Sequence, residues 1–373
     1  MKQILSLIIL TMAITVAGTL HAGPGLGGGE KIQIALLLDT SSSMDGLIDQ
    51  AKSKLWKIVN ELAAAEKDGK TPDLEVALFE YGKSTIPEGE SYMRMIIPFT
   101  GDLDRISAEL FALTTNGGDE YCGKVIDSAT KNLAWEKSSG SLKLIFIAGN
   151  EPFNQGETSY IEAGRKAKAK KIIINTIFCG DNETGISTYW KDGADITGGK
   201  YINIDHNRKV MTIVAPQDAE ITRLNIELNK TYIAYGRKGN EKKMEQELQD
   251  TNARSISGGT ATERAISKAS TQYRNSSWDI VDAVKDREVD LKEMDDEDLP
   301  EEMKGMDRGE REKYVKQVSK RREDIRKRIN KLNIERRAYI EKTEKKQGGE
   351  DTLDSAIIKT VRKQAAEKNF KFR

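Results

Sequence analysis

The chain has 373 residues, and its 59 lysines and arginines are balanced by 59 aspartates and glutamates. This length predicts two or three structural units, and the balanced charge excludes a whole-chain attraction to nucleic acid or to an anionic membrane. Only two histidines occur, His21 and His206, which excludes a histidine-rich zinc site. If the N-terminus is removed as an export signal, His206 is the one candidate base for a hydrolytic triad.

The N-terminus has the pattern of an export signal. Lys2 precedes an apolar run from Ile4 to Val16, and Ala22 is a small residue at the expected cleavage position. The run is short for a membrane span, and no later segment is apolar enough to cross a bilayer. We therefore expect a signal peptide over residues 1–22, a glycine-rich linker over residues 23–30, and a periplasmic or secreted protein. An uncleaved anchor helix is the alternative.

Buried strands and amphipathic helices alternate from residue 31 to residue 206. Several strands are continuous apolar runs, which is typical of strands covered on both faces of a parallel sheet. The expected strands cover residues 32–38, 74–79, 93–99, 142–147, 172–178 and 201–204. The expected helices cover residues 47–62, 102–113, 123–133 and 160–170. This alternation predicts a doubly wound, mostly parallel α/β sheet over residues 31–206.

The pattern becomes helical and highly charged after residue 206. We expect a mixed, mainly helical region over residues 207–310, with helices over 219–249 and 261–285, followed by a charged segment over 311–373. Residues 311–346 contain one apolar seven-residue series and one half-basic series. The apolar series is Val318, Ile325, Leu332 and Tyr339, and the half-basic series is Val315, Arg322, Ile329 and Arg336.

Two seven-residue series of this kind, one apolar and one half basic, are consistent with either a solvated single helix or an imperfect coiled coil through which the chain self-associates. The basic residues of this segment are interleaved with acidic residues and lack aromatic neighbours. Nucleic-acid binding is therefore not expected.

The strongest motif, Asp39-Thr40-Ser41-Ser42-Ser43, directly follows the first predicted strand. Open α/β sheets bind ligands outside the carboxyl ends of their strands. One carboxylate and two hydroxyls at this place are hard oxygen ligands of the kind that Mg²⁺ prefers. Aspartate and serine are also the preferred helix N-caps, which is the alternative explanation. We favour a cation site at Asp39, Ser41 and Ser43.

The D-x-S-x-S motif and the segment Ala194–Tyr201 resemble the two ends of the von Willebrand factor type A (vWA) domain family. The resemblance covers roughly residues 30–205. It implies a metal-ion-dependent adhesion site that holds one Mg²⁺ or Mn²⁺. It also implies that a protein ligand completes the coordination of the metal with an acidic side chain.

Two further loops of the family's metal site have counterparts in this chain. The resemblance implies that Asp119 is a metal ligand, with Glu120 as the second choice. The third loop departs from the family's T-D-G-E-P pattern, because Gly149 occupies the aspartate position. Asn150 or Glu151 would then reach the metal directly or through water. The stretches around these residues resemble a group of exported bacterial vWA proteins.

The only two cysteines, Cys122 and Cys179, are predicted to lie at the carboxyl edge of the sheet. An even number of cysteines in an exported chain favours a disulfide, and we expect one between them. Two separate thiols are the alternative.

These observations predict a non-catalytic, metal-dependent protein-binding module that acts outside the cytoplasm. The first alternative is a structural scaffold with a degenerate metal site, which binds partners through its C-terminal helices. An envelope hydrolase is the third possibility, and the scarcity of histidine argues against it.

Overall fold

The computed structural model describes residues 30–204, 213–295, 297–346 and 353–372. The predicted signal peptide, the linker up to residue 29 and His206 lie outside these ranges. Among the helices in this described part of the chain, none combines the length and the apolar character that crossing a bilayer requires.

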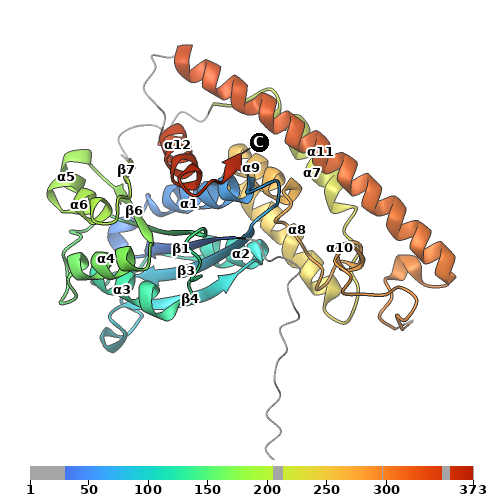
Figure 1. Ribbon diagram of the computed structural model, residues 1–373, viewed down its shortest axis with the longest axis horizontal. Coiled ribbons are helices and arrows are strands. Elements are labelled where there is room, and N and C mark those ends of the chain that lie inside the picture. The colour runs from blue at the N-terminus through green and yellow to red at the C-terminus, as the bar shows by residue number, and fades with distance from the viewer. Residues whose placement is uncertain (1–29, 205–212, 296, 347–352, 373) are drawn as a thin grey trace, which may run out of the picture.

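A six-stranded sheet forms the centre of the first half of the chain, with strand order β4-β3-β1-β5-β6-β7 (Figure 1). The strands are β1 (Lys31–Asp39), β3 (Asp73–Tyr81), β4 (Met93–Thr100), β5 (Leu142–Gly149), β6 (Ile173–Cys179) and β7 (Tyr201–Ile204). All neighbours pair in parallel except β3 and β4. The predicted doubly wound, mostly parallel sheet is confirmed.

Helices cover both faces of this sheet, which explains why its central strands are continuously apolar. One face carries α1 (Ile48–Ala63) and α2 (Leu103–Ala112). The other carries α3 (Cys122–Asn132), α4 (Tyr160–Ala169) and α6 (Trp190–Asp195), and the short α5 (Asn182–Ser187) precedes α6. Side chains of β1 alternate between the two cores: Ile34 and Leu36 face one, whereas Ala35 and Leu37 face the other.

The helical region packs onto the α1 and α2 side of the sheet and shares its core. Its helices are α7 (Asp218–Asn229), α8 (Gly239–Ile256), α9 (Gly258–Ala269), α10 (Ile280–Lys285), α11 (Arg308–Lys346) and α12 (Leu353–Ala366). Leu224, Ile329 and Val361 from three of these helices belong to the same apolar cluster as β1. α12 packs on α1, and β8 (Lys371–Phe372) then pairs with β2 (Ala65–Glu66).

The helices predicted over 219–249 and 261–285 are each broken into two. Ile233 leaves the helix, where its N–H donates to Asp279 Oδ1 at 2.7 Å and its carbonyl accepts from Ile280. Gly236 then takes a positive φ of 69°, which reverses the chain before α8. These contacts join residues about 46 positions apart, so the local periodicity did not predict them.

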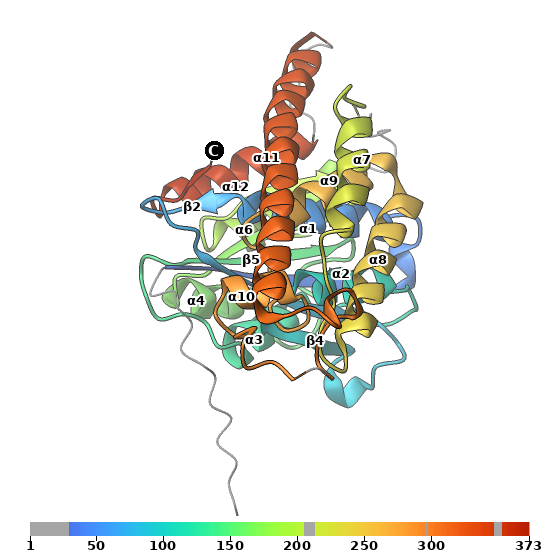
Figure 2. The ribbon, with the colours of Figure 1, turned by 90° about the vertical axis from the view of Figure 1, so that its right-hand side faces the viewer.

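The half-basic series of α11 faces the body of the protein. Its members Val315, Arg322, Ile329 and Arg336 are all buried. Of the apolar series, Ile325 is buried and Tyr339 is exposed. Arg322 donates to Asp279 and Asp282, and Arg336 donates to Asp218 and Glu263. α7, α9 and α10 of the same chain thus cover this seam (Figure 2), and it is not available for a coiled coil with a second copy.

Candidate metal centre

Asp39 is the last residue of β1 and lies at the carboxyl edge, beside Tyr81 at the end of β3. The chain turns immediately afterwards, and the Ser41 N–H donates to Asp39 Oδ1 at 2.8 Å. A 3₁₀ helix, Ser42–Met44, leads into α1. The Ser41 side chain makes no capping hydrogen bond to this helix, so capping does not explain the motif.

The structure brings the two serines of the motif together with Asn150. Ser41 Oγ lies 2.8 Å from Ser43 Oγ, and Ser43 Oγ donates to Asn150 Oδ1 at 2.9 Å. Asn150 Nδ2 in turn donates to the Ser43 carbonyl at 3.0 Å. The third loop is therefore connected to the first, although it lacks the family's aspartate.

Of the two neighbouring carboxylates in the second loop, Glu120 rather than Asp119 lies in the site. Glu120 is buried, and burial is the largest cause that raises its pKa to about 8. The charges of Asp39, Glu151 and Asp119 raise this pKa further, whereas a hydrogen bond from Ser41 opposes the rise. Asp119 is exposed, and its Oδ2 accepts a hydrogen bond from Tyr121 at 3.2 Å.

Two glycines shape the space around Asp39, and the role of each was missed in the sequence. A Cβ added to Gly82, which has a φ of 78°, would lie 2.7 Å from Asp39 Oδ1 and 3.0 Å from Glu120 Cγ. A Cβ added to Gly149 would lie 2.6 Å from the Tyr81 hydroxyl and 3.0 Å from Asp39 Oδ2. The Tyr81 phenol therefore occupies space that an aspartate at position 149 would need.

Asp39 is a buried acid without a cationic partner. Its Oδ2 makes no hydrogen bond within the described residues. Burial is the main cause that raises its pKa to about 7. The N–H and hydroxyl of Ser41 and the nearby backbone N–H of Asn150 lower this pKa without giving Oδ2 a full hydrogen bond, and the charge of Glu151 raises it. An acid held in this way favours a nearby positive charge, which would remove the cost of its ionisation.

The basic side chains near the ends of β3 and β4 bind Glu80 rather than Asp39. Lys83 Nζ lies 3.5 Å from Glu80 Oε2, and Arg94 Nε lies 2.5 Å from Glu80 Oε1. In the described part of the chain, no group of three or more histidine, cysteine, aspartate or glutamate side chains is arranged to hold a metal. The donors at this edge are instead one or two carboxylates, two hydroxyls and an amide, a set that suits a hard cation.

The predicted disulfide is wrong. Cys122 and Cys179 are free, buried thiols. Cys122 belongs to the core between the sheet and α3, whereas Cys179 belongs to the core on the opposite face. The sheet therefore separates the two sulfur atoms. Burial raises the pKa of both thiols well above the usual range, so neither has the reactivity of a thiolate nucleophile.

Residues 33–185 match the family model described as the von Willebrand factor type A domain. A comparison with curated proteins gave no match. Among solved structures, the chain is similar to the conserved hypothetical protein BatB from Bacteroides thetaiotaomicron, with 17% identity over 47% of this chain and 90% of that chain, at a TM-score of 0.36. It is also similar to the SpRpn10 VWA domain, with 16% identity over 50% of this chain and 100% of that chain, at a TM-score of 0.37.

A third similar structure is proximal thread matrix protein 1 from the mussel byssus, with a zinc-occupied metal-ion-dependent adhesion motif. The identity is 11% over 48% of this chain and 43% of that chain, at a TM-score of 0.36. At these values the structural similarities carry no inference about function, and the site has to be judged from its own residues.

Proposed function

We propose that this chain, which carries a von Willebrand factor type A domain over residues 33–185, is a protein-binding module whose contact with its ligand depends on a divalent cation. The family model describes a type of domain that serves in protein interaction and adhesion. The single observation that carries the metal dependence is the Oδ2 atom of Asp39, which is buried without a partner beside two serine hydroxyls.

The ligands we propose are Asp39, Ser41 and Ser43, with Glu120 and Asn150 on the adjoining loops. Asp119 and Glu151 contribute negative charge nearby rather than direct contact. Because all the donors are oxygen atoms, we propose Mg²⁺ or Mn²⁺. The bound cation would offset the charge of Asp39 and Glu120, and it would offer a coordination position to an acidic side chain of the protein ligand.

Binding rather than catalysis is the activity that these residues support. Both thiols are buried and have raised pKa values, and the hydroxyls of Ser41 and Ser43 lie together next to the Asp39 carboxylate. The export signal predicted over residues 1–22 supports a location in the periplasm or outside the cell.

A second candidate is a scaffold that binds through its C-terminal helices independently of metal. The observation that favours it is the length of α11, whose 39 residues leave one face in solvent (Figure 1). The two candidates differ in one property, because only the first requires a cation.

Affinity capture from an envelope fraction separates them. Wild-type protein should retain a partner in Mg²⁺ and release it in chelator, and Asp39→Ala should retain none in either buffer. Asp73→Ala, an exposed acid at the opposite end of β3, is the matched control and should behave as wild type. Equal recovery in Mg²⁺ and in chelator would favour the scaffold instead.

A further inference from the structure

The loops at the carboxyl edge of the sheet are strongly acidic. The segments 40–47, 82–92, 113–121, 150–159 and 180–189 contain nine carboxylates and only one basic residue, Lys83. Lys83 and Arg94, the second residue of β4, both bind Glu80, so together they offset only part of this acidic charge. The buried, unpartnered Oδ2 of Asp39 lies at the same edge, and it independently indicates a positively charged ligand.

This charge restricts the kind of protein that can donate a carboxylate to the metal. One divalent cation offsets only part of the negative potential of nine carboxylates. A partner carboxylate would approach these loops against repulsion unless it brought positive charges of its own. The ligand surface should therefore present one acidic side chain surrounded by lysines or arginines.

The chain itself carries a surface of this composition on α11. Residues 308–346 contain 16 lysines and arginines but only seven aspartates and glutamates, and two of these arginines, Arg322 and Arg336, are buried. Because the whole chain is neutral, the rest of the protein carries the matching excess of acid. Glu323 and Glu341 on this helix are bonded to Lys327 at 3.0 Å and Lys345 at 2.8 Å.

Asp324 differs from those two glutamates. It is exposed and makes no ion pair with any residue that the structure describes. Lys320, Arg321 and Arg328 lie one turn or less away on the helix and are exposed, and Arg328 also donates to Glu220 of α7 at 3.0 Å. Together with Glu227 of α7, they line a hollow of about 370 Å³ around Asp324.

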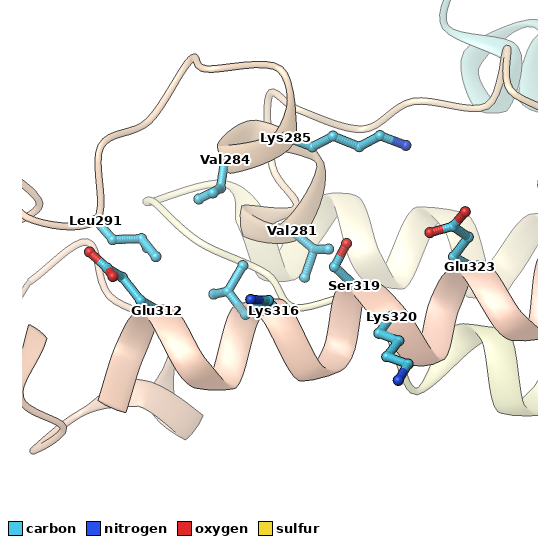
Figure 3. Close-up of a pocket in the computed structure, with 10 residues that line it drawn as sticks. Val281, Val284, Lys285, Leu291, Glu312, Lys316, Ser319, Lys320 and Glu323 are labelled. Carbon is cyan, nitrogen blue, oxygen red and sulfur yellow. The ribbon is translucent and has the colours of Figure 1, made fainter. Parts of the chain in front are cut away.

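Lys320 also borders a second hollow, the apolar crevice between α10 and α11 (Figure 3). Val281, Val284 and Leu291 form one wall of this crevice. In Figure 3, Lys320 extends from α11 away from these apolar side chains. Its ammonium group is therefore directed outward, where it is available to a second protein surface.

Asp324 cannot serve the metal centre of its own chain. α11 packs against α7, α9 and α10, and Asp324 lies on its exposed side. In Figure 1, α11 runs along the right-hand side of the molecule, whereas α5, which follows β6 at the carboxyl edge, lies on the left. Any contact between the two surfaces is thus a contact between two molecules.

We propose that the protein ligand of the metal centre is a second copy of this chain, which donates the carboxylate of Asp324. Lys320, Arg321 and Arg328 of that copy would face the acidic loops around the metal. The inference rests on the proposed function, because it needs a bound cation. The two surfaces lie on opposite sides of the molecule, so the contact is head-to-tail and joins copies into open chains rather than a closed dimer.

Sedimentation velocity on the purified chain tests this assembly over a range of protein concentrations. Wild type should form concentration-dependent oligomers in Mg²⁺ at low salt, and chelator or high salt should return it to monomer. Asp324→Asn should be monomeric. Lys320→Glu combined with Arg321→Glu should weaken association by at least about tenfold, because both substitutions replace attraction with repulsion. Glu335→Gln, another exposed acid of α11, should assemble as wild type.

A mixing experiment identifies the two halves of the contact. Asp39→Ala keeps the donor surface and lacks the metal centre, whereas Asp324→Asn keeps the metal centre and lacks the donor. Each variant alone should be monomeric, and their mixture should form a heterodimer and nothing larger. Unchanged association of Asp324→Asn alone would overturn the proposal.

Metal titration on the same samples separates failure of this inference from failure of the proposed function. Wild type that binds Mg²⁺ yet stays monomeric at all concentrations would overturn the self-association and leave the metal site in place. Wild type that binds no divalent cation would overturn both.

Discussion

Asp39 at the carboxyl edge and Asp250 in the helical region are both almost fully buried, yet their surroundings have opposite electrostatic character. Asp250 accepts hydrogen bonds from Lys268 at 2.8 Å and from Arg264 at 3.0 Å, and Asn225 also donates to it. Asp39 accepts from the backbone of Ser41, and its other oxygen has no hydrogen-bond partner in the described structure.

The pKa values of the two acids follow this difference. Burial raises the pKa of Asp250, but Lys268 and Arg264 outweigh burial and hold that pKa well below its usual range. Burial raises the pKa of Asp39 to about 7, because no cation opposes it. A buried acid with its cations built into the fold stabilises the fold, whereas one without them is suited to an external cation.

Removal of Asp250 should have the largest effect on stability. Asp250→Ala would leave Lys268 buried beside Arg264 without their shared carboxylate, and we expect a loss of about 3–5 kcal/mol of unfolding free energy. Urea denaturation followed by circular dichroism measures it. Glu323→Ala, which breaks an exposed ion pair with Lys327, is the control and should unfold at nearly the same urea concentration as wild type. A small loss in Asp250→Ala would mean that the network does not hold the helices in place.

Asp39→Asn should change the unfolding free energy in the opposite direction and stabilise the protein in chelator. The substitution removes the buried charge and keeps an oxygen for the Ser41 N–H, so in chelator at pH 8 we expect the variant to be more stable than wild type by about 2 kcal/mol. Excess Mg²⁺ should stabilise wild type and leave the variant unchanged, because only a protein that binds the cation gains from it. Thermal unfolding with and without Mg²⁺ measures both effects, and a less stable variant in chelator would contradict the comparison.

The stability difference between Asp39→Asn and wild type should depend on pH in chelator. The folded pKa of Asp39 is raised to about 7, so wild type loses stability relative to the variant as pH rises above the unfolded value of about 4. The loss should be complete above pH 7. Asp250 has a lowered folded pKa, so its contribution should be present above pH 4 and be lost as pH falls further. A flat difference between pH 4 and pH 8 would show that Asp39 is not a buried, unpaired acid.

Of the four predicted changes in stability, that of Gly149→Ala should be the smallest. The new Cβ would meet the Tyr81 hydroxyl, and we expect a loss of about 1–2 kcal/mol from overpacking. Tyr81→Phe in the same protein removes that hydroxyl and should recover part of the loss. Chemical denaturation of the single and double variants gives the coupling free energy between the two substitutions. If the double variant loses as much unfolding free energy as Gly149→Ala alone, the Tyr81 hydroxyl is not the group that the new Cβ meets.

The sheet and the Asp39 motif could be predicted from the sequence because both depend on local patterns. Buried parallel strands are continuous apolar runs, and a ligand site follows the end of a strand. The burial of Glu120 and the exposure of its neighbour Asp119 could not be predicted, because adjacent residues in a loop point in different directions. The prediction of a disulfide was wrong because the two cysteines lie at the same edge of the sheet but on its opposite faces.

The buried face of α11 was unpredictable for a different reason. Arg322 and Arg336 are buried because Asp279 and Glu263, distant in sequence, supply their carboxylates. Seven-residue periodicity identifies apolar seams, and it does not identify a basic seam that acidic residues elsewhere neutralise.

Isothermal titration calorimetry with Mg²⁺, and separately with Mn²⁺, tests the central claim most directly. We expect one divalent cation to bind per wild-type chain at millimolar metal or below. We expect no binding to Asp39→Ala, whose circular dichroism spectrum should match that of wild type. Absence of binding to wild type at millimolar metal, or equal binding to Asp39→Ala, would contradict the assignment of this edge as a metal centre.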